Sequence, residues 1–110
     1  MKARYIQRGE SIDYVPETDV AAGDIVKLGG LVGVAKLDIR AGELGALATV
    51  GVYEVDPGGA AVSVGDVVCV DPATGKVCAE GADGAVRFGH AVTAATPADS
   101  VVHVRLQQGV

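Results

Sequence analysis

Short apolar runs, each the length of a β-strand, are separated by glycine-rich turns along this chain. In the segment 19–55, residues 25–28 and residues 31–34 form two such runs on either side of Gly29 and Gly30. A Gly-Gly pair tolerates the positive φ angles that a two-residue hairpin turn demands. The pattern therefore predicts a tight hairpin with apolar pairs across it, Ile25 opposite Val34 and Leu28 opposite Leu31.

The third run of this segment alternates apolar positions with a period of two, which is typical of a half-buried strand. The chain turns through residues 38–43 and then continues as one predicted strand over residues 44–52. The residues expected on its buried face are Leu44, Ala46, Ala48, Val50 and Val52.

The clearest hairpin of the second half lies within residues 62–80, where the runs VVCV and KVCAE flank the turn sequence DPATG. Pro72 is preset for a type I turn, and Gly75 suits the left-handed position that follows. Two further apolar runs within residues 86–106 predict the C-terminal strands. Counting outward from the turn predicts three cross-strand pairs: Asp71 with Lys76, Val70 with Val77, and Cys69 with Cys78.

The opening of the chain, residues 1–16, predicts an N-terminal hairpin or arm with its turn at Gly9 and Glu10. Because proline cannot donate to a strand ladder, we expect a loop from Pro16 onward. The β-favouring residues on the two sides of the turn are Tyr5, Ile6, Ile12 and Tyr14.

The pattern also bears on the fold as a whole, since no segment of about eleven residues repeats apolar positions at the spacing of a helix. We therefore predict an all-β fold, a small compact barrel or sandwich of β-hairpins with little or no helix. At 110 residues the chain fits a single β domain, 1–110. Aromatic residues make up only 4% of the sequence, so the core must consist of small aliphatic side chains. Such a thin core leads us to expect that a partner subunit covers part of the apolar surface.

Charge and hydropathy restrict the possible partners. The formal net charge is −5, with nine Lys and Arg residues scattered among 14 Asp and Glu residues. Nucleic-acid affinity depends mainly on cations that neutralise phosphates, so nucleic-acid binding is disfavoured. No apolar stretch reaches the roughly 18–20 residues that span a bilayer, and the first residues lack the pattern of a signal peptide. We therefore expect no membrane association, and synthesis in the cytoplasm.

Two cysteines and two histidines are the candidates for chemistry. For Cys69 and Cys78 the alternatives are free thiols, a cross-strand disulfide and half of a metal site. Zinc prefers four ligands, and a reducing cytosol favours buried free thiols. His90 and His103 lie in predicted strands with no recognisable nucleophile beside them, so we expect ordinary strand residues. The sequence therefore predicts no enzyme, no metal and no cofactor.

A resemblance emerges from the order of turns and strands. The central segment reads VAAGDIVKLGGLVGVAKLDIRAGELGALATVGVY, and it is preceded by MKARYIQRGESIDYVPETD. Together with the later GHAV and the closing VRL, this order resembles the family of small phage head decoration, or capsid cement, proteins known as DUF2190. The resemblance implies a structural virion protein that binds the outside of a bacteriophage capsid and clamps adjacent major capsid subunits, often as a homotrimer.

Two other assignments depend on specific motifs. Relatives in the DUF2190 family are sometimes labelled recombinase-like, which would imply a P-loop of Gly, four residues, then Gly-Lys-Ser/Thr. Neither Lys36 nor Lys76 stands in that pattern, so the label is unsupported. The form V-x-x-G-D-x-V resembles turns of lipoyl and biotinyl carrier domains. A small β-barrel carrier or ligand-binding module is thus the alternative function, although the carrier motif Asp-Lys-Ala or Met-Lys-Met is absent.

Intermolecular contacts are expected in the first residues of the chain. The predicted opening hairpin holds two of the three tyrosines together with two arginines, and both residue types are enriched at interface hot spots. We expect this segment to add a strand to the major capsid protein or to join the subunits of a trimer. The candidate interface residues are Arg4, Tyr5, Arg8, Ile12 and Tyr14.

Overall fold

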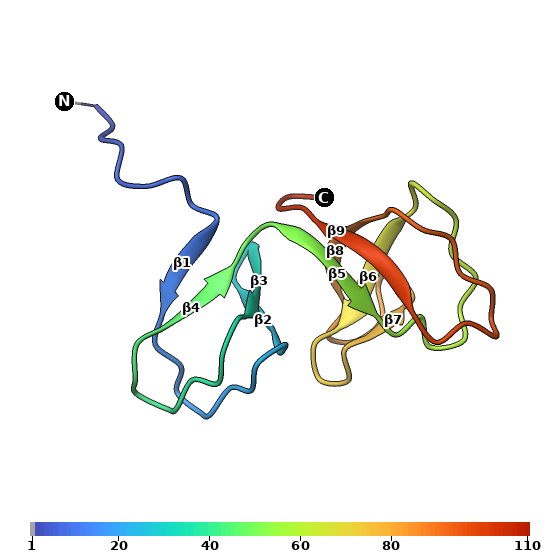
Figure 1. Cartoon of the computed structure of the whole chain (residues 1–110), viewed down its shortest axis with the longest axis horizontal. Coiled ribbons are helices and arrows are strands. Elements are labelled where there is room, and N and C mark those ends of the chain that lie inside the picture. The colour runs from blue at the N-terminus through green and yellow to red at the C-terminus, as the bar shows by residue number, and fades with distance from the viewer. Residues whose placement is uncertain (1) are drawn as a thin grey trace.

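The computed structural model describes residues 2–110 and contains nine β-strands in two sheets (Figure 1). No helix occurs in this range, so the prediction of an all-β fold is confirmed. The strands are β1 (Ser11–Tyr14), β2 (Ile25–Leu28), β3 (Leu31–Ala35), β4 (Gly45–Ala48), β5 (Gly51–Val55), β6 (Val67–Asp71), β7 (Lys76–Cys78), β8 (Val86–Ala91) and β9 (Val102–Leu106).

The first sheet has the strand order β1-β4-β3-β2, and all its neighbours are antiparallel. Its β2–β3 hairpin turns at Gly29, whose φ is 56°, while Gly30 has no left-handed φ. Glycine at the first central position is the signature of a type II′ turn, which matches the twist of the flanking strands. The predicted register is confirmed, since Ile25 pairs with Val34 and Leu28 pairs with Leu31.

The second sheet, with the order β5-β9-β8-β6-β7, curls into a half-barrel. Its two edges meet where Asp56, just after β5, forms a parallel bridge with Lys76 of β7. The N–H of Val77 donates to the carbonyl oxygen of Asp56 at 2.9 Å. Joining the edges in this way leaves less unpaired strand backbone exposed. The β6–β7 hairpin has the predicted register, with Cys69 opposite Cys78.

Strand β3 of the first sheet contributes to both hydrophobic cores and is buried from Val32 to its end. Val32 and Val34 join the core of the half-barrel, in which Phe88 is the largest fully buried side chain. On the opposite face, Ala35 packs with Leu47 in the core of the first sheet. The two sheets therefore depend on the same strand, and most core positions are filled by small aliphatic side chains, as the composition predicted.

A side chain beyond β9 completes the backbone hydrogen bonds of β3. Gln108 accepts from the N–H of Val32 at 2.9 Å through Oε1, and it donates through Nε2 to the carbonyl oxygen of Val32 at 2.7 Å. The same Nε2 donates to the carbonyl oxygen of Thr49 at 3.0 Å. Because Thr49 lies in the link between β4 and β5, one amide group joins the edge of β3 to the junction of the two sheets.

The predicted hairpin within the opening residues is wrong. Residues 2–10 form no strand, and β1 pairs instead with β4, where Ser11 lies opposite Ala48. Thr49 continues this ladder, since its N–H donates to the carbonyl oxygen of Glu10 at 3.0 Å. The hydroxyl of Thr49 donates to the carbonyl oxygen of Gly9. A two-stranded hairpin alone is marginal in water, whereas β4 offers a sheet with a hydrophobic face.

The single strand predicted over residues 44–52 is also wrong, because the chain passes from one sheet to the other within it. β4 ends at Ala48, and β5 begins at Gly51. Gly51 has a φ of 126°, an angle that residues with a side chain rarely adopt. This bend cannot be read from an alternating apolar pattern, which continues through it.

The buried face of that segment differs from the predicted one as well. Ala48 is buried as predicted, but Leu47 is fully buried too, whereas Leu44, Val50 and Val52 are exposed. Leu47 packs directly over Gly33 of β3, where an added Cβ would lie 2.8 Å from the Cβ of Leu47. The absence of a side chain at Gly33 therefore leaves the space that Leu47 occupies, and β4 is buried on both faces at its end.

Strand β8 contains a bulge next to Gly89. Its register with β6 shifts so that Val68 pairs with Gly89 and Cys69 with Arg87, which leaves Phe88 without a partner residue in β6 and directed into the core. Bulges increase local twist, which favours the curvature of the half-barrel. At Gly89 the backbone of β9 approaches so closely that an added Cβ would lie 1.7 Å from the carbonyl oxygen of Arg105.

We predict that Gly89→Ala lowers the free energy of unfolding by about 3 kcal/mol or more, because β8 and β9 must separate to admit the methyl group. Gly30→Ala is the matched control, since nothing lies within 4 Å of a Cβ there. The control should change stability by less than about 0.5 kcal/mol. Urea unfolding of both variants measures the difference, and equal stabilities would contradict the close approach of the two strands.

Replacing Gln108 should weaken the junction of the two sheets. We expect Gln108→Ala to lower the free energy of unfolding by about 1–3 kcal/mol, because the N–H and carbonyl oxygen of Val32 lose their partner in a partly buried position. Gln108→Glu keeps the acceptor oxygen but lacks the N–H donor, so it should lower the free energy of unfolding by an intermediate amount. Urea unfolding checks this order, and an alanine variant as stable as the parent would show that water replaces the amide without cost.

Candidate interaction site

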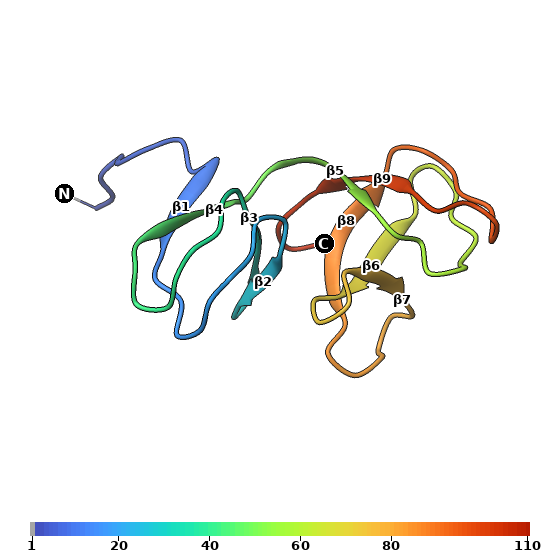
Figure 2. The same cartoon turned by 60° about the horizontal axis from the view of Figure 1, so that its bottom comes forward.

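Residues 2–8, which we call the arm, form no strand, and each of them is exposed. Tyr5 and Ile6 are 77% and 76% exposed, which is unusual for large apolar side chains. Figures 1 and 2 both show the arm leaving the molecule beside β1 and pointing away from the second sheet. The arm therefore presents apolar surface that the rest of this chain does not cover.

The structure divides the five predicted interface residues into two groups. Arg4, Tyr5 and Arg8 lie on the exposed arm. Ile12 and Tyr14 lie in β1, where they are half-buried and pack against the core of the first sheet. Three of the five are therefore free to contact another molecule, and the other two support the fold.

Charge separates the arm from the rest of the chain. The arm carries three cations and no anion, Lys2, Arg4 and Arg8. Residues 9–110 hold the other six Lys and Arg residues and all 14 Asp and Glu residues, a formal net charge of −8. Arg8 pairs with Glu10, but both side chains are exposed, so this ion pair holds the arm only weakly. An acidic partner surface is therefore electrostatically suited to the arm.

The half-barrel has an apolar cavity of about 360 Å³ at the end of the β6–β7 hairpin, which we call the edge pocket. Sequence reasoning missed it, because it is formed by three short segments within residues 60–80, none of which has a motif. Its lining residues are Ala60, Ala61, Val62, Asp66, Val67, Val68, Cys69, Val77, Cys78, Ala79 and Glu80.

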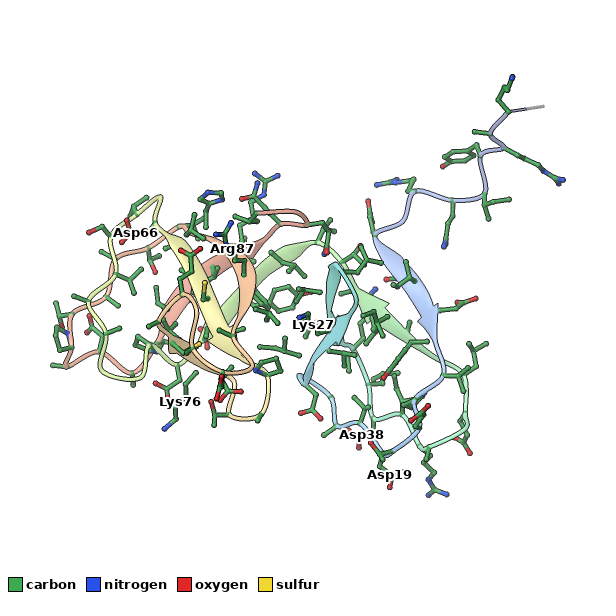
Figure 3. All side chains as sticks on the ribbon, turned by 180° about the vertical axis from the view of Figure 1, so that it is seen from behind. Asp19, Lys27, Asp38, Asp66, Lys76 and Arg87 are labelled. Atoms are coloured by element: carbon green, nitrogen blue, oxygen red, sulfur yellow. The ribbon has the colours of Figure 1, made fainter. Side chains whose placement is uncertain are left out.

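Two carboxylates lie in the lining of the edge pocket. Glu80 pairs with Arg87, so its charge is balanced within the chain. Asp66 has no cationic partner among the described residues, and it accepts the N–H of Ser63 at 2.9 Å. Figure 3 shows Asp66 at the end of the half-barrel that lies farthest from the first sheet. The edge pocket therefore combines an apolar lining with an uncompensated negative charge.

Both cysteines contribute to the edge pocket as free thiols, Cys69 buried and Cys78 partly exposed. The prediction of buried thiols thus holds for Cys69, whereas Cys78 is accessible. Burial raises the pKa of the Cys69 thiol, and the neighbouring Glu80 and Cys78 raise this pKa further, while Arg87 opposes the shift. A raised pKa makes Cys69 a weak nucleophile.

A second cavity, of about 370 Å³, lies among the loops of the first sheet and contains three aspartates. Each aspartate is already engaged with a backbone N–H. Asp19 accepts from Ala41 at 2.9 Å, Asp24 from Ala21 at 3.0 Å, and Asp38 from Ala22 at 2.8 Å. Figure 3 shows Asp19 and Asp38 close together at the lower edge of the first sheet. These aspartates stabilise turns, which accounts for their presence.

The two histidines lie on the outer face of the second sheet. His103 contacts Glu54 at 3.3 Å, and His90 is hydrogen-bonded to the side chain of Gln107. Neither histidine lines the cavities of about 360 and 370 Å³. Within residues 2–110, no three His, Cys, Asp or Glu side chains come together as metal ligands.

Comparison with protein families bears on the function of the chain as a whole. A family model described as phage cement protein matches residues 6–106. The chain belongs to the phage cement protein family. This assignment confirms the resemblance noted in the sequence and gives the cement protein a structural role associated with the phage capsid. A search of curated proteins and a search of solved structures each found no match.

Two further observations concern other assignments of this cement protein. Within residues 2–110, none of the structure forms a helix with the length and hydropathy needed to cross a bilayer. Lys76 lies in β7 opposite Asp71, outside the turn residues 72–75. Lys76 is therefore a strand residue, and it is not displayed at a hairpin tip as a carrier lysine would be.

The two thiols of the cement protein should react at different rates. In dilute protein we expect Cys78 to react readily with a disulfide reagent such as DTNB and Cys69 to react slowly, because Cys69 is buried and its pKa is raised. The Cys69 rate should keep rising further into the alkaline range than that of an exposed thiol. The variant Cys78→Ser isolates the slow thiol, and equally fast reaction of both thiols in the parent would contradict the burial of Cys69.

Proposed function

We propose that this chain is a decoration protein that binds the outer surface of the phage head and holds adjacent major capsid subunits together. The observation that carries the proposal is the match to the phage cement family over residues 6–106. A structural role of this kind requires no reaction, and the chain acts through the surface that it buries. It is made in the cytoplasm of the bacterial host and acts on the virion.

The exposed arm supports an intermolecular role. Tyr5 and Ile6 expose apolar surface beside Arg4 and Arg8, and aromatic and arginine side chains dominate the energetics of protein interfaces. An extended segment can add a strand to the sheet edge of a partner, which provides backbone hydrogen bonds as well as side-chain contacts. The partner is the major capsid protein or a second copy of this chain.

Assembly as a homotrimer would multiply weak contacts. Each copy contributes a modest interface, but three linked copies on a lattice bind with a far smaller combined dissociation constant than one copy alone. The thin core also favours this arrangement, because neighbouring subunits can cover apolar surface such as Tyr5 and Ile6.

Deleting the arm tests the proposal without damaging the fold. The deletion should stop at Arg8, because Ser11–Tyr14 form an edge strand of the first sheet. We expect the deletion to change the free energy of unfolding by less than about 0.5 kcal/mol, since the arm makes no packed contact with the body. Occupancy of phage heads should fall by about tenfold or more, which corresponds to a loss of about 1.4 kcal/mol of binding.

Quantitative mass spectrometry of purified virions measures this occupancy against the major capsid protein. Leu37→Ala is the matched control, because Leu37 is a 75% exposed apolar residue on the body of the molecule. The parent chain and the control should be present at a copy number close to that of the major capsid protein. Absence of the parent from intact particles would refute the proposed function. Full occupancy by the deletion variant would show that the arm is not needed for binding to the phage head.

A further inference from the structure

The edge pocket lies beside an unpaired part of a strand. Val67 and Val68 of β6 pair on one side with His90 and Gly89 of β8. On the other side, the pairing with β7 begins only at Cys69. The part of β6 before Cys69 therefore has no β7 residue paired with it, and unpaired strand edges are the positions at which extended segments add.

We propose that the edge pocket of one copy binds the arm of a second copy, with Ile6 inserted among the alanine, valine and cysteine side chains. This inference rests on the proposed function, since it assumes that copies of the chain assemble, and it names the partner of the arm. The edge pocket supplies an apolar cavity and a free strand edge, and the arm supplies an extended segment with an exposed aliphatic side chain.

The charges of the two surfaces are complementary. In an extended segment, residues two apart lie on the same face, so Arg4 and Arg8 flank Ile6 on the side that enters the edge pocket. The edge pocket contains Asp66, which has no cationic partner among the described residues, and Glu80, which is paired with Arg87. Docking therefore brings two cations toward an uncompensated carboxylate.

The arm of the same copy cannot occupy the edge pocket. The hydroxyl of Thr49 donates a hydrogen bond to Gly9 and so fixes the base of the arm. Ile6 is three residues from Gly9, and three residues span at most about 11 Å. Asp66 marks the edge pocket at the end of the half-barrel farthest from the first sheet, whereas the arm leaves beside β1 (Figure 3). The molecule is 48 Å long along its principal axis. Contact must therefore occur between copies.

The geometry of this contact is heterologous, because the arm and the edge pocket are different surfaces of the molecule. Heterologous contacts generate closed rings when the rotation between copies closes, and a homotrimer is one such ring. Each copy in a ring donates one arm and accepts one, so every Tyr5–Ile6 pair finds a partner and none is left exposed.

Disulfide trapping tests the contact in the full-length protein. In the variant Ile6→Cys, the introduced thiol should lie near Cys78, the accessible thiol of the edge pocket. Oxidised glutathione accepts the two electrons and two protons of the two thiols and is reduced to two molecules of glutathione, while one disulfide forms between the chains. A non-reducing gel should show covalent dimers and larger species, and mass spectrometry should link position 6 to Cys78 or Cys69.

Two controls make the trapping specific. Leu37→Cys places an equally exposed thiol on the body, and it should give only background cross-linking. Adding Cys78→Ser to the Ile6→Cys variant should abolish the bond to position 78. Cross-linking of Leu37→Cys at the same yield, or no bond between position 6 and the edge pocket, would overturn the inference.

A measurement without cross-linking provides a second test. In the parent, the Cys78 thiol should become about tenfold less reactive when the protein is about ten times more concentrated than the dissociation constant of the assembly. Ile6→Asp should remove this protection, because a carboxylate would enter an apolar pocket that already contains Asp66. Protection that persists in Ile6→Asp would refute the role of Ile6.

The outcomes separate this inference from the proposed function. If position 6 does not cross-link but deletion of the arm still empties the virion of this protein, the arm binds the capsid and the inference is wrong. If position 6 cross-links to the edge pocket but the parent is absent from virions, the inference stands and the proposed function fails.

Discussion

The double burial of β3 is the constraint on which the rest of the structure depends. One face of this strand supplies Val32 and Val34 to the half-barrel, and the other supplies Ala35 to the first sheet. A strand covered on both sides has no solvent face to absorb a change in side-chain size. Gly33 shows the consequence, since Leu47 occupies the space where its side chain would be.

Local signals in the sequence predicted the two hairpins correctly because each is determined by its own turn. Gly29-Gly30 and the sequence DPATG fix the register of β2–β3 and β6–β7. Contacts between distant segments could not be predicted in this way. The pairing of β1 with β4 and the division of residues 44–52 between two sheets depend on the tertiary positions of β3 and Thr49.

The same distinction applies to the candidate interaction site. Composition alone suggested Arg4, Tyr5 and Arg8 as candidate interface residues, because arginine and tyrosine on an otherwise acidic chain are visible in the sequence. Burial of Ile12 and Tyr14 against the first core could not be seen there, since their alternation fits both an exposed hairpin and an edge strand. The edge pocket had no sequence signal, because its lining consists mainly of small apolar residues that belong to no motif.

The position of Thr49 ties the base of the arm to the junction of the two sheets. Thr49 donates hydrogen bonds to the carbonyl oxygens of Gly9 and Glu10, and its own carbonyl oxygen accepts from Gln108. The residues that follow the arm are therefore fixed to the link between β4 and β5 as well as to the edge of the first sheet. A partner that binds the arm is thus attached to the part of the molecule where both sheets meet.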